Sequence, residues 1–253
     1  MTTVNEPVAI PGAPQPTLSV WSRAVAVFAR PAEAWIGLER RAQWWFPLLV
    51  AVLVSVAGTL VVYQRAIVPS QLEQFERQVE AGQLPAEAMA GIEEQVAGPV
   101  SMGFTLGAIV VAVPVMTCVF ALLPWISAGF LLGRRFRYRD AFAVTAWAGL
   151  VAIPAQILSY LLGWINESMS GVHTGFGVLL PVEDPPSKLM AGLGVFLDQG
   201  IGPLALWYVL VVALGAAAVT GGDRRRVIVT VGAVWLVVMA VVSVVVGLVA
   251  PGA

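Results

Sequence analysis

Charged residues are absent from five long stretches of this 253-residue chain. The stretches are residues 42–64, 95–133, 141–166, 199–222 and 227–253, and the shortest has 23 residues. A helix needs about 20 apolar residues to cross the hydrocarbon core of a bilayer, so each stretch is long enough for one crossing. Only 11% of the chain is charged, whereas a soluble domain carries about 25% charged residues. The pattern predicts an all-α membrane protein and excludes a soluble enzyme.

Aromatic residues and prolines indicate where the five spans begin, end and bend. The first span opens at Trp44 and closes at Tyr63, residue types that favour the membrane interface. The second stretch is 39 residues long and contains Pro99, Pro114 and Pro124. We predict one long, kinked span here, because proline removes a backbone donor and bends a helix. A re-entrant hairpin of two half-spans is the alternative. The expected spans cover residues 44–63, 100–132, 141–164, 201–220 and 227–249.

The distribution of basic residues predicts the orientation of the spans. Four arginines precede the first span, four lie between spans 2 and 3, and three lie between spans 4 and 5, so 11 of 14 Lys and Arg residues fall on one side. The positive-inside rule places that side, with the N-terminus, in the cytoplasm and the C-terminus outside. Basic residues that flank spans are also candidates for contact with anionic lipid headgroups, or they only set the topology. These candidates are Arg134, Arg135, Arg224, Arg225 and Arg226.

Residues 1–17 are rich in proline and predict a flexible tail. Two later elements outside the spans are expected to be helical. Residues 18–43 predict a cytoplasmic amphipathic helix in the membrane interface, because Leu18, Trp21 and Val25 recur at helical spacing beside arginines. A short helix packed on the bundle is the alternative.

Residues 64–94, between spans 1 and 2, predict an extracytoplasmic helical hairpin. Ser70 and Glu73 have the spacing of a capping box at the start of its first arm. Gly82 breaks the pattern, and Pro85 suits the first turn of the second arm.

The five expected spans contain no Asp, Glu, Lys, Arg or His. Ionisable residues inside a membrane usually mark ion paths, proton relays or catalytic sites. Their absence argues against a proton-coupled transporter and against an intramembrane protease, so we expect no enzyme and no cofactor. A single His and a single Cys exclude a structural zinc cluster of these residues. The net charge of −1 provides no basic field for nucleic acid. Neither a metal nor a nucleic-acid partner is therefore expected.

Small and polar residues inside the spans are candidates for contacts between helices. Gly103 and Gly107 form one small-residue pair in span 2, and Gly129 and Gly133 form another. Such pairs let helix backbones approach closely, either within this bundle or against a partner. Gln156 is the most polar side chain well inside a span. We expect it to bond a neighbouring helix, and the alternative is that it lines a cavity.

Loop residues between spans 3 and 4 are the remaining polar candidates. Asp198 precedes span 4, where it suits a helix cap or an ion pair with Lys188. An enzymatic function would require four loop residues to converge, which are His173, Glu167, Glu183 and Asp184. A solvated loop is the simpler interpretation of these four residues.

Four motifs, in order, resemble the Yip1 domain family of five-span membrane proteins. The first is Phe28-Ala-Arg-Pro-Ala-Glu-Ala-Trp35, and the second is Trp44-Trp-Phe-Pro47 at the start of span 1. The third runs from Arg137 through Phe142 to Trp147, with Pro154 after it, and the fourth is Leu197-Asp198 followed by Trp207 and Gly215. The resemblance covers about residues 20–250. The family-motif positions are Phe28, Pro31, Trp35, Phe142, Pro154, Asp198 and Trp207.

The resemblance implies a helical bundle with a cytoplasmic N-terminus and without known catalytic residues. Eukaryotic members of this family are linked to small-GTPase-dependent vesicle traffic and to membrane shaping, and some bacterial members look like accessory partners of export machinery. The chain lacks the long N-terminal domain of the eukaryotic members, so GTPase binding is not expected. Its length and its Ala/Val/Arg-rich composition are typical of a bacterial member, in the cytoplasmic membrane.

We therefore expect a non-enzymatic integral membrane scaffold or an accessory subunit of a membrane complex. Its partners would be the lipid bilayer and either another membrane protein or a second copy of the chain. The alternative is a carrier or channel for a neutral or lipid-like solute, because proline-interrupted spans around Gln156 could open a cavity.

Overall fold

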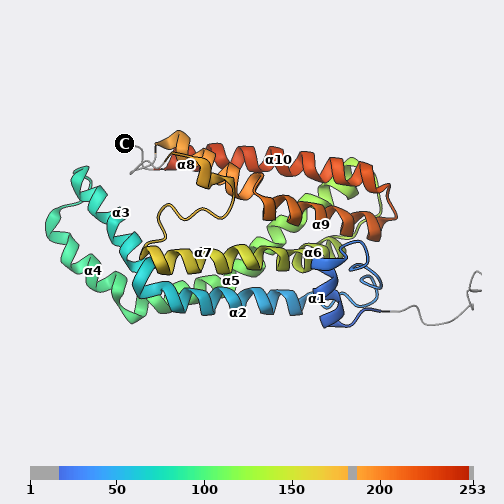
Figure 1. Ribbon diagram of the computed structural model, residues 1–253, viewed down its shortest axis with the longest axis horizontal. Helices are drawn as coiled ribbons and strands as arrows, with labels where there is room; N and C mark the ends of the chain where they lie inside the picture. The colour runs from blue at the N-terminus through green and yellow to red at the C-terminus, as the bar shows by residue number, and fades with distance from the viewer. Residues whose placement is uncertain (1–16, 182–186, 251–253) are drawn as a thin grey trace, which may run out of the picture.

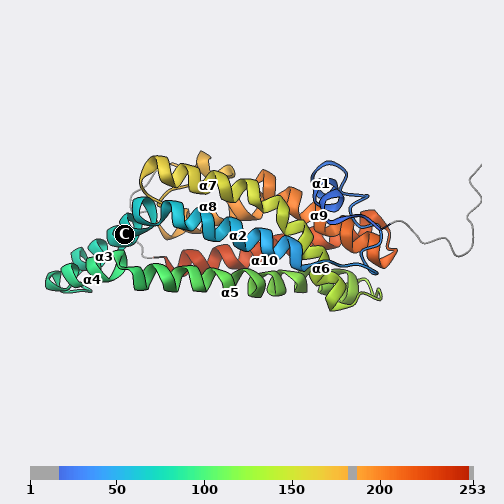
Figure 2. The same ribbon diagram turned by 90° about the horizontal axis from the view of Figure 1, so that it is seen from below.

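The computed structural model describes residues 17–181 and 187–250, and in these ranges the regular structure is entirely helical. The predicted tail therefore lies almost wholly outside the described residues. Five helices are long and apolar enough to cross a membrane: Trp45–Glu80, Pro99–Leu131, Tyr138–Asn166, Pro203–Thr220 and Arg224–Val249. The prediction of an all-α protein with five spans is confirmed. The five helices run along the same long axis of the molecule, except that the last part of the first helix, Val68–Glu80, bends away from it (Figures 1 and 2).

The helical elements follow one another with short connections. In chain order they are α1 (Val20–Ala29), α2 (Trp45–Val62), η1 (Tyr63–Ile67), α3 (Val68–Glu80), η2 (Ala86–Ala88), α4 (Met89–Ala97), α5 (Pro99–Pro124), η3 (Trp125–Leu131), α6 (Tyr138–Ala148), η4 (Gly149–Ala152), α7 (Ile153–Asn166), η5 (Phe176–Leu179), α8 (Lys188–Val195), η6 (Phe196–Gly200), α9 (Pro203–Thr220) and α10 (Arg224–Val249). The two ends of the bundle differ. We call the end with α1 and the arginine-rich loops the basic end, and the end with α3 and α4 the hairpin end (Figure 1).

The first span continues without a break into the hairpin. α2, the π-helical turn η1 and α3 form one helix of 36 residues. The predicted capping box is therefore wrong, because Ser70 lies inside a helix and its hydroxyl donates to the carbonyl of Ala66 at 2.7 Å. The hairpin turns at Gly82, whose φ of +69° suits glycine. The second arm returns beside the first, since the Tyr63 hydroxyl donates to the carbonyl of Val96 at 3.0 Å.

The second span is one continuous helix, as predicted, and not a re-entrant hairpin. α5 and η3 together run from Pro99 to Leu131, which is 33 residues. At 1.5 Å per residue this helix is about 50 Å long, well beyond the ~30 Å hydrocarbon core. Pro114 and Pro124 lie inside α5, and the backbone changes to π-helical geometry directly after Pro124. Proline thus changes the local helix geometry without ending the span.

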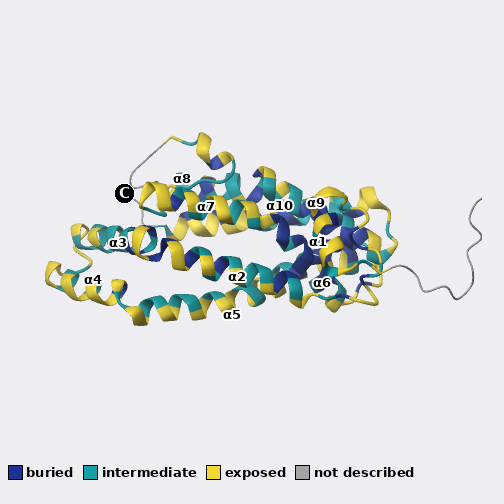
Figure 3. Cartoon of the chain, turned by 60° about the horizontal axis from the view of Figure 1, so that its bottom comes forward, coloured by how far each residue is buried: buried dark blue, intermediate teal, exposed yellow. Residues whose placement is uncertain are grey.

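The buried core lies towards the basic end of the bundle (Figure 3). It is built from the N-terminal segment and from α6, α9 and α10, and it includes the fully buried side chains of Val27, Val144, Trp147 and Val211. Towards the hairpin end, α7 packs mainly on α2, whereas α8 packs on α10. α5 stays at the edge of the bundle, with only Ala121 and Pro124 buried. The fold is therefore most tightly packed where the N-terminal segment meets the spans.

α8 is an element that the sequence pattern did not predict. It lies beside the C-terminal half of α10 at a glycine–glycine contact: a Cβ at Gly192 would lie 2.7 Å from the carbonyl oxygen of Ser243, and one at Gly247 would lie 2.7 Å from that of Lys188. Residues 165–200 contain glycine and proline and show little periodicity, so the sequence predicts a loop there, and glycine also weakens helix propensity. Gly192 and Gly247 let α8 approach α10 closely, and this packing offsets the weak helix propensity of α8.

Candidate functional site

The N-terminal motif folds back onto the bundle and fills a space between two spans. Trp35 is buried, and a Cβ at Gly215 of α9 would lie 2.9 Å from its indole ring and 2.6 Å from Val144 of α6. The glycine therefore leaves the room that the indole occupies. A second aromatic, Trp147 of α6, donates from its indole nitrogen to the carbonyl of Ala42 at 2.8 Å. The motif residues before span 1 and those of spans 3 and 4 thus form one packed unit.

Arg23 of α1 is completely buried in this unit, and sequence reasoning did not identify it. Its guanidinium donates to the carbonyls of Ala34 at 3.1 Å and Ile36 at 3.2 Å, and it lies 5.6 Å from the centre of the Trp147 ring. Burial lowers the pKa of Arg23 to about 10, so the side chain stays charged near neutral pH. Two carbonyl acceptors and an aromatic face offset part of the lost hydration, while Nε is buried without a hydrogen-bond partner among the described residues. The hydrogen bonds to Ala34 and Ile36 hold α1 against the turn that follows it.

α1 packs on the core with one side and exposes apolar residues on the other. Arg23, Ala26 and Val27 are buried, whereas Trp21 is 73% exposed, Val25 63% and Phe28 44%. An exposed apolar face next to arginine-rich loops is typical of a helix that lies in the membrane interface.

We expect Arg23→Ala to destabilise the protein by about 2–4 kcal/mol, because the buried carbonyl of Ala34 and the partly buried carbonyl of Ile36 lose their charged donor. The stability of Arg23→Lys should lie between those of the wild type and Arg23→Ala, since a lysine ammonium cannot reproduce the planar geometry of the guanidinium donors. Unfolding in a detergent–SDS titration measures the effect. The matched control is Arg30→Ala, because Arg30 pairs only with Glu33 in an exposed ion pair at 3.4 Å. Equal stability of the two alanine variants would contradict the assigned role of Arg23.

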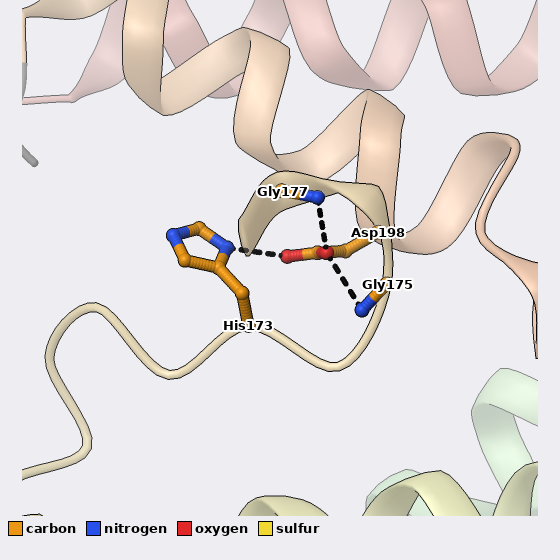
Figure 4. A network of polar contacts seen from close by, with 4 residues as sticks. All are labelled: His173, Gly175, Gly177 and Asp198. Atoms are coloured by element: carbon orange, nitrogen blue, oxygen red, sulfur yellow. Dashed lines mark hydrogen bonds and ion pairs between the residues drawn. The ribbon is translucent and has the colours of Figure 1, made fainter. Parts of the chain in front are cut away.

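Asp198 is the centre of a polar cluster (Figure 4). Its turn η6 lies beside the middle of α10, because the Trp235 indole donates to the carbonyl of Gly200 at 2.9 Å. One carboxylate oxygen accepts from the backbone N–H groups of Gly175 and Gly177, each at 2.9 Å. The other lies 2.6 Å from Nδ1 of His173. Asp198 belongs to the π-helical turn η6, and α9 begins later at Pro203. The prediction that Asp198 caps span 4 or pairs with Lys188 is therefore wrong, because the carboxylate instead holds a loop that is distant in sequence.

The same loop is attached at its other end to the hairpin. Glu167 pairs with Arg65 at 2.7 Å, and the N–H of Met169 donates to the Ser70 hydroxyl at 2.6 Å. The segment from residue 167 to residue 177 therefore connects the base of α3 with η6, and we call it the strap. Glu167 and His173 have different partners and do not converge. Glu183 and Asp184 lie outside the described residues, and within the described ranges no three His, Cys, Asp or Glu residues gather as metal ligands.

Gln156 bonds a neighbouring helix, which confirms the main prediction for this residue. Its side-chain nitrogen donates to the Ser55 hydroxyl of α2 at 2.7 Å and to the Tyr160 hydroxyl at 3.1 Å. Tyr160 in turn donates to the carbonyl of Ser55 at 3.3 Å. The Tyr160 ring lies directly against Gly58 of α2, where a Cβ would overlap it. α2 and α7 are therefore joined by a polar network within the membrane-spanning part.

The two small-residue pairs of span 2 lie in different environments. Gly103 and Gly107 are on an exposed side of α5, and a Cβ at either would meet no described atom within 4 Å. Gly129 lies in η3 near Trp125 and Phe136. Gly133 follows the helix with a φ of +63°, so the second pair does not form a helix face. Only the first pair remains a candidate partner face.

The other motif positions lie in different environments. Phe142 stacks edge-on against Trp44 with ring centres 5.6 Å apart, and Trp207 packs partly buried against the core. Pro31 is partly buried after α1, whereas Pro154 is exposed in the first turn of α7.

Of the five arginines proposed to contact lipid, Arg134, Arg225 and Arg226 line neighbouring hollows at the basic end, whereas Arg135 and Arg224 line neither.

The described residues form an all-helical integral membrane protein. It has five apolar spans, an N-terminal segment packed on them and a helical hairpin. The profile of the Yip1 domain family matches residues 25–245, which is nearly the whole chain. The chain belongs to the Yip1 domain family. Searches of curated proteins and of solved structures found no match.

Proposed function

We propose that this membrane protein is a non-enzymatic scaffold or accessory subunit that works through contacts within the bilayer. We place its basic end and N-terminus in the cytoplasm and its hairpin end outside, in a bacterial cytoplasmic membrane. The observation that carries the proposal is the combination of span polar side chains that are mostly hydrogen-bonded within the fold with an exposed α5–η3 helix of 33 residues. The family membership is consistent with this role, because the resemblance implies a bundle without known catalytic residues.

Most polar side chains of the described spans are hydrogen-bonded within the fold, and the buried Thr145 hydroxyl, which has no described hydrogen-bond partner, is an exception. Hydroxyls of Ser55, Thr105 and Ser243 donate to carbonyls one turn earlier in their own helices. The side-chain nitrogen of Gln156 donates to the hydroxyls of Ser55 and Tyr160. These bonds argue against a solute pathway around Gln156. The His173–Asp198 pair is engaged with the backbone of the strap, so it serves structure. Neither transport nor hydrolysis finds support in these groups.

The surface offered to a partner is the side of α5 that carries Gly103 and Gly107. Small residues permit the close backbone approach on which helix association in membranes depends, because apolar side chains gain little by leaving lipid. Both glycines are exposed in this structure. We propose that another membrane protein, or a second copy of this chain, packs on this side.

Replacing Gly103 and Gly107 with leucine is expected to reduce partner recovery at least about ten-fold, a change equal to 1.4 kcal/mol of association free energy. The measurement is mild-detergent purification of the full chain with quantitative mass spectrometry, together with size-exclusion chromatography with light scattering for self-association. The matched control is Ala108→Leu with Ala112→Leu. Both alanines are exposed in α5 and keep the same spacing, about 140° around the helix from the glycines.

Two results would count against the scaffold. One is a wild-type chain that is monomeric and brings down no membrane protein reproducibly. The other is an equal loss in the glycine and alanine variants, which would mean that any added bulk on α5 disturbs the chain.

A further inference from the structure

Two loops that are far apart in sequence bring arginines together at the basic end. Arg134 follows η3, and its backbone N–H donates to the carbonyl of Ala128 at 3.1 Å. Its side chain reaches the turn before α10, since a Cβ at Gly222 would lie 3.9 Å from its Nε. Arg134 and Arg226 line one hollow together with Asp223 and Leu132. A second hollow beside it shares Leu132, Asp223 and Arg226.

The charges around these hollows favour an anion. Arg134, Arg225 and Arg226 contribute three positive charges, and Asp223 offsets one of them. One oxygen of Asp223 is already used, because it accepts from the backbone N–H of Arg226 at 2.8 Å. None of the three arginines forms an ion pair with a residue that the structure describes. The N-terminus of α10 adds the positive end of a helix dipole.

The hollows are apolar on one side. Leu132 borders both of them, and the second is completed by Val229, which is 62% exposed, and by Thr230. These residues lie one turn or more inside α10 or at the end of the α5–η3 helix, both of which are spans. A free anion would gain nothing from such a lining. A molecule with a phosphate group and hydrocarbon chains would satisfy both sides, because arginine forks bind phosphate and the chains would follow the spans.

We propose that these two hollows form a single binding site for the phosphate headgroup of an anionic phospholipid. Arg134 and Arg226 donate to the phosphate oxygens from two sides, and Arg225 closes the site from the second hollow. The acyl chains leave past Leu132 and Val229 along α10. The site joins the end of the α5–η3 helix to the start of α10, so a bound lipid links the loop after η3 to the loop before α10.

The experiment measures binding of full-length protein in detergent micelles to three probes: phosphatidylglycerol, phosphatidylcholine and inorganic phosphate. Arg134→Gln with Arg226→Gln is expected to weaken phosphatidylglycerol binding about ten-fold more than the control pair, the equivalent of one charge-assisted hydrogen bond. The control pair is Arg135→Gln with Arg224→Gln. It removes the same charge from the same two loops, but neither residue lines the hollows.

A second variant is expected to change the affinity for phosphatidylglycerol in the opposite direction. Asp223→Asn keeps a side chain that caps α10 and removes the negative charge from the hollows. It is expected to strengthen phosphatidylglycerol binding several-fold, with wild-type stability as the check on folding. Equal losses in both glutamine pairs would overturn the proposal in favour of a diffuse surface charge. Binding of inorganic phosphate as tight as that of phosphatidylglycerol would overturn the lipid assignment, and so would no preference for phosphatidylglycerol over phosphatidylcholine.

Discussion

Replacing Gly58 with alanine is expected to destabilise the protein by about 3 kcal/mol, which is the upper range for overpacking a well-packed contact. The added methyl group would overlap the ring of Tyr160. To make room, α2 and α7 must separate, and the bonds from Gln156 to Ser55 and from Tyr160 to Ser55 would lengthen with them. Unfolding in an SDS titration of the detergent-solubilised protein measures the change.

The control for this substitution is Gly232→Ala in α10, another glycine within a span. A Cβ at Gly232 would meet no described atom within 4 Å, so the change should be neutral or slightly stabilising through better helix propensity. Tyr160→Ala in the Gly58→Ala background should recover part of the loss, because it removes the overlapping ring. Additive effects of the two substitutions would show that Gly58 and Tyr160 do not act on each other.

The second large effect is expected at Asp198. Asp198→Ala removes the acceptor for two backbone N–H groups and for His173. We expect local opening of the strap to become easier by about 3 kcal/mol, which corresponds to exchange roughly 100-fold faster at the amides of Gly175 and Gly177. Hydrogen exchange with mass spectrometry over the strap measures this directly.

Asp198→Asn is the matched variant for this prediction. Its side-chain oxygen can still accept from Gly175 and Gly177, and its nitrogen can donate to a neutral His173. Most of the protection should therefore remain. Unchanged exchange in Asp198→Ala would show that the strap is held by its other attachments, such as Glu167 to Arg65.

The spans could be predicted well because they depend on a property of each stretch by itself. A segment of 20 or more residues without charge has few stable environments other than a bilayer or a protein core, and in lipid its backbone must be helical. The structure contains five helices long and apolar enough to cross a membrane, and Gln156 pairs with a neighbouring helix as expected. The continuity of span 2 through Pro114 also follows from this, since proline can bend a membrane helix that its neighbours support.

The wrong predictions all concern residues whose partners are distant in sequence. Ser70 and Glu73 have capping-box spacing, but the helix of span 1 continues past them and leaves Ser70 to bind the strap. Asp198 has the position of a cap, but it lies within 3 Å of three donors more than 20 residues earlier. Local patterns describe which bonds a residue can make, and the packing of other elements decides which bonds it does make.

The sequence by itself determined the all-helical class, the number of spans and the family, because charge-free length and motif order are properties of the linear chain. Tertiary structure alone decided that the Arg23 side chain is buried, that Asp198 holds the strap, and that Arg134 and Arg226 line the same hollow. Each of these depends on how close two segments approach. The same is true of glycines such as Gly58 and Gly215, because the neighbour that fills the space of the missing side chain is known only from the structure.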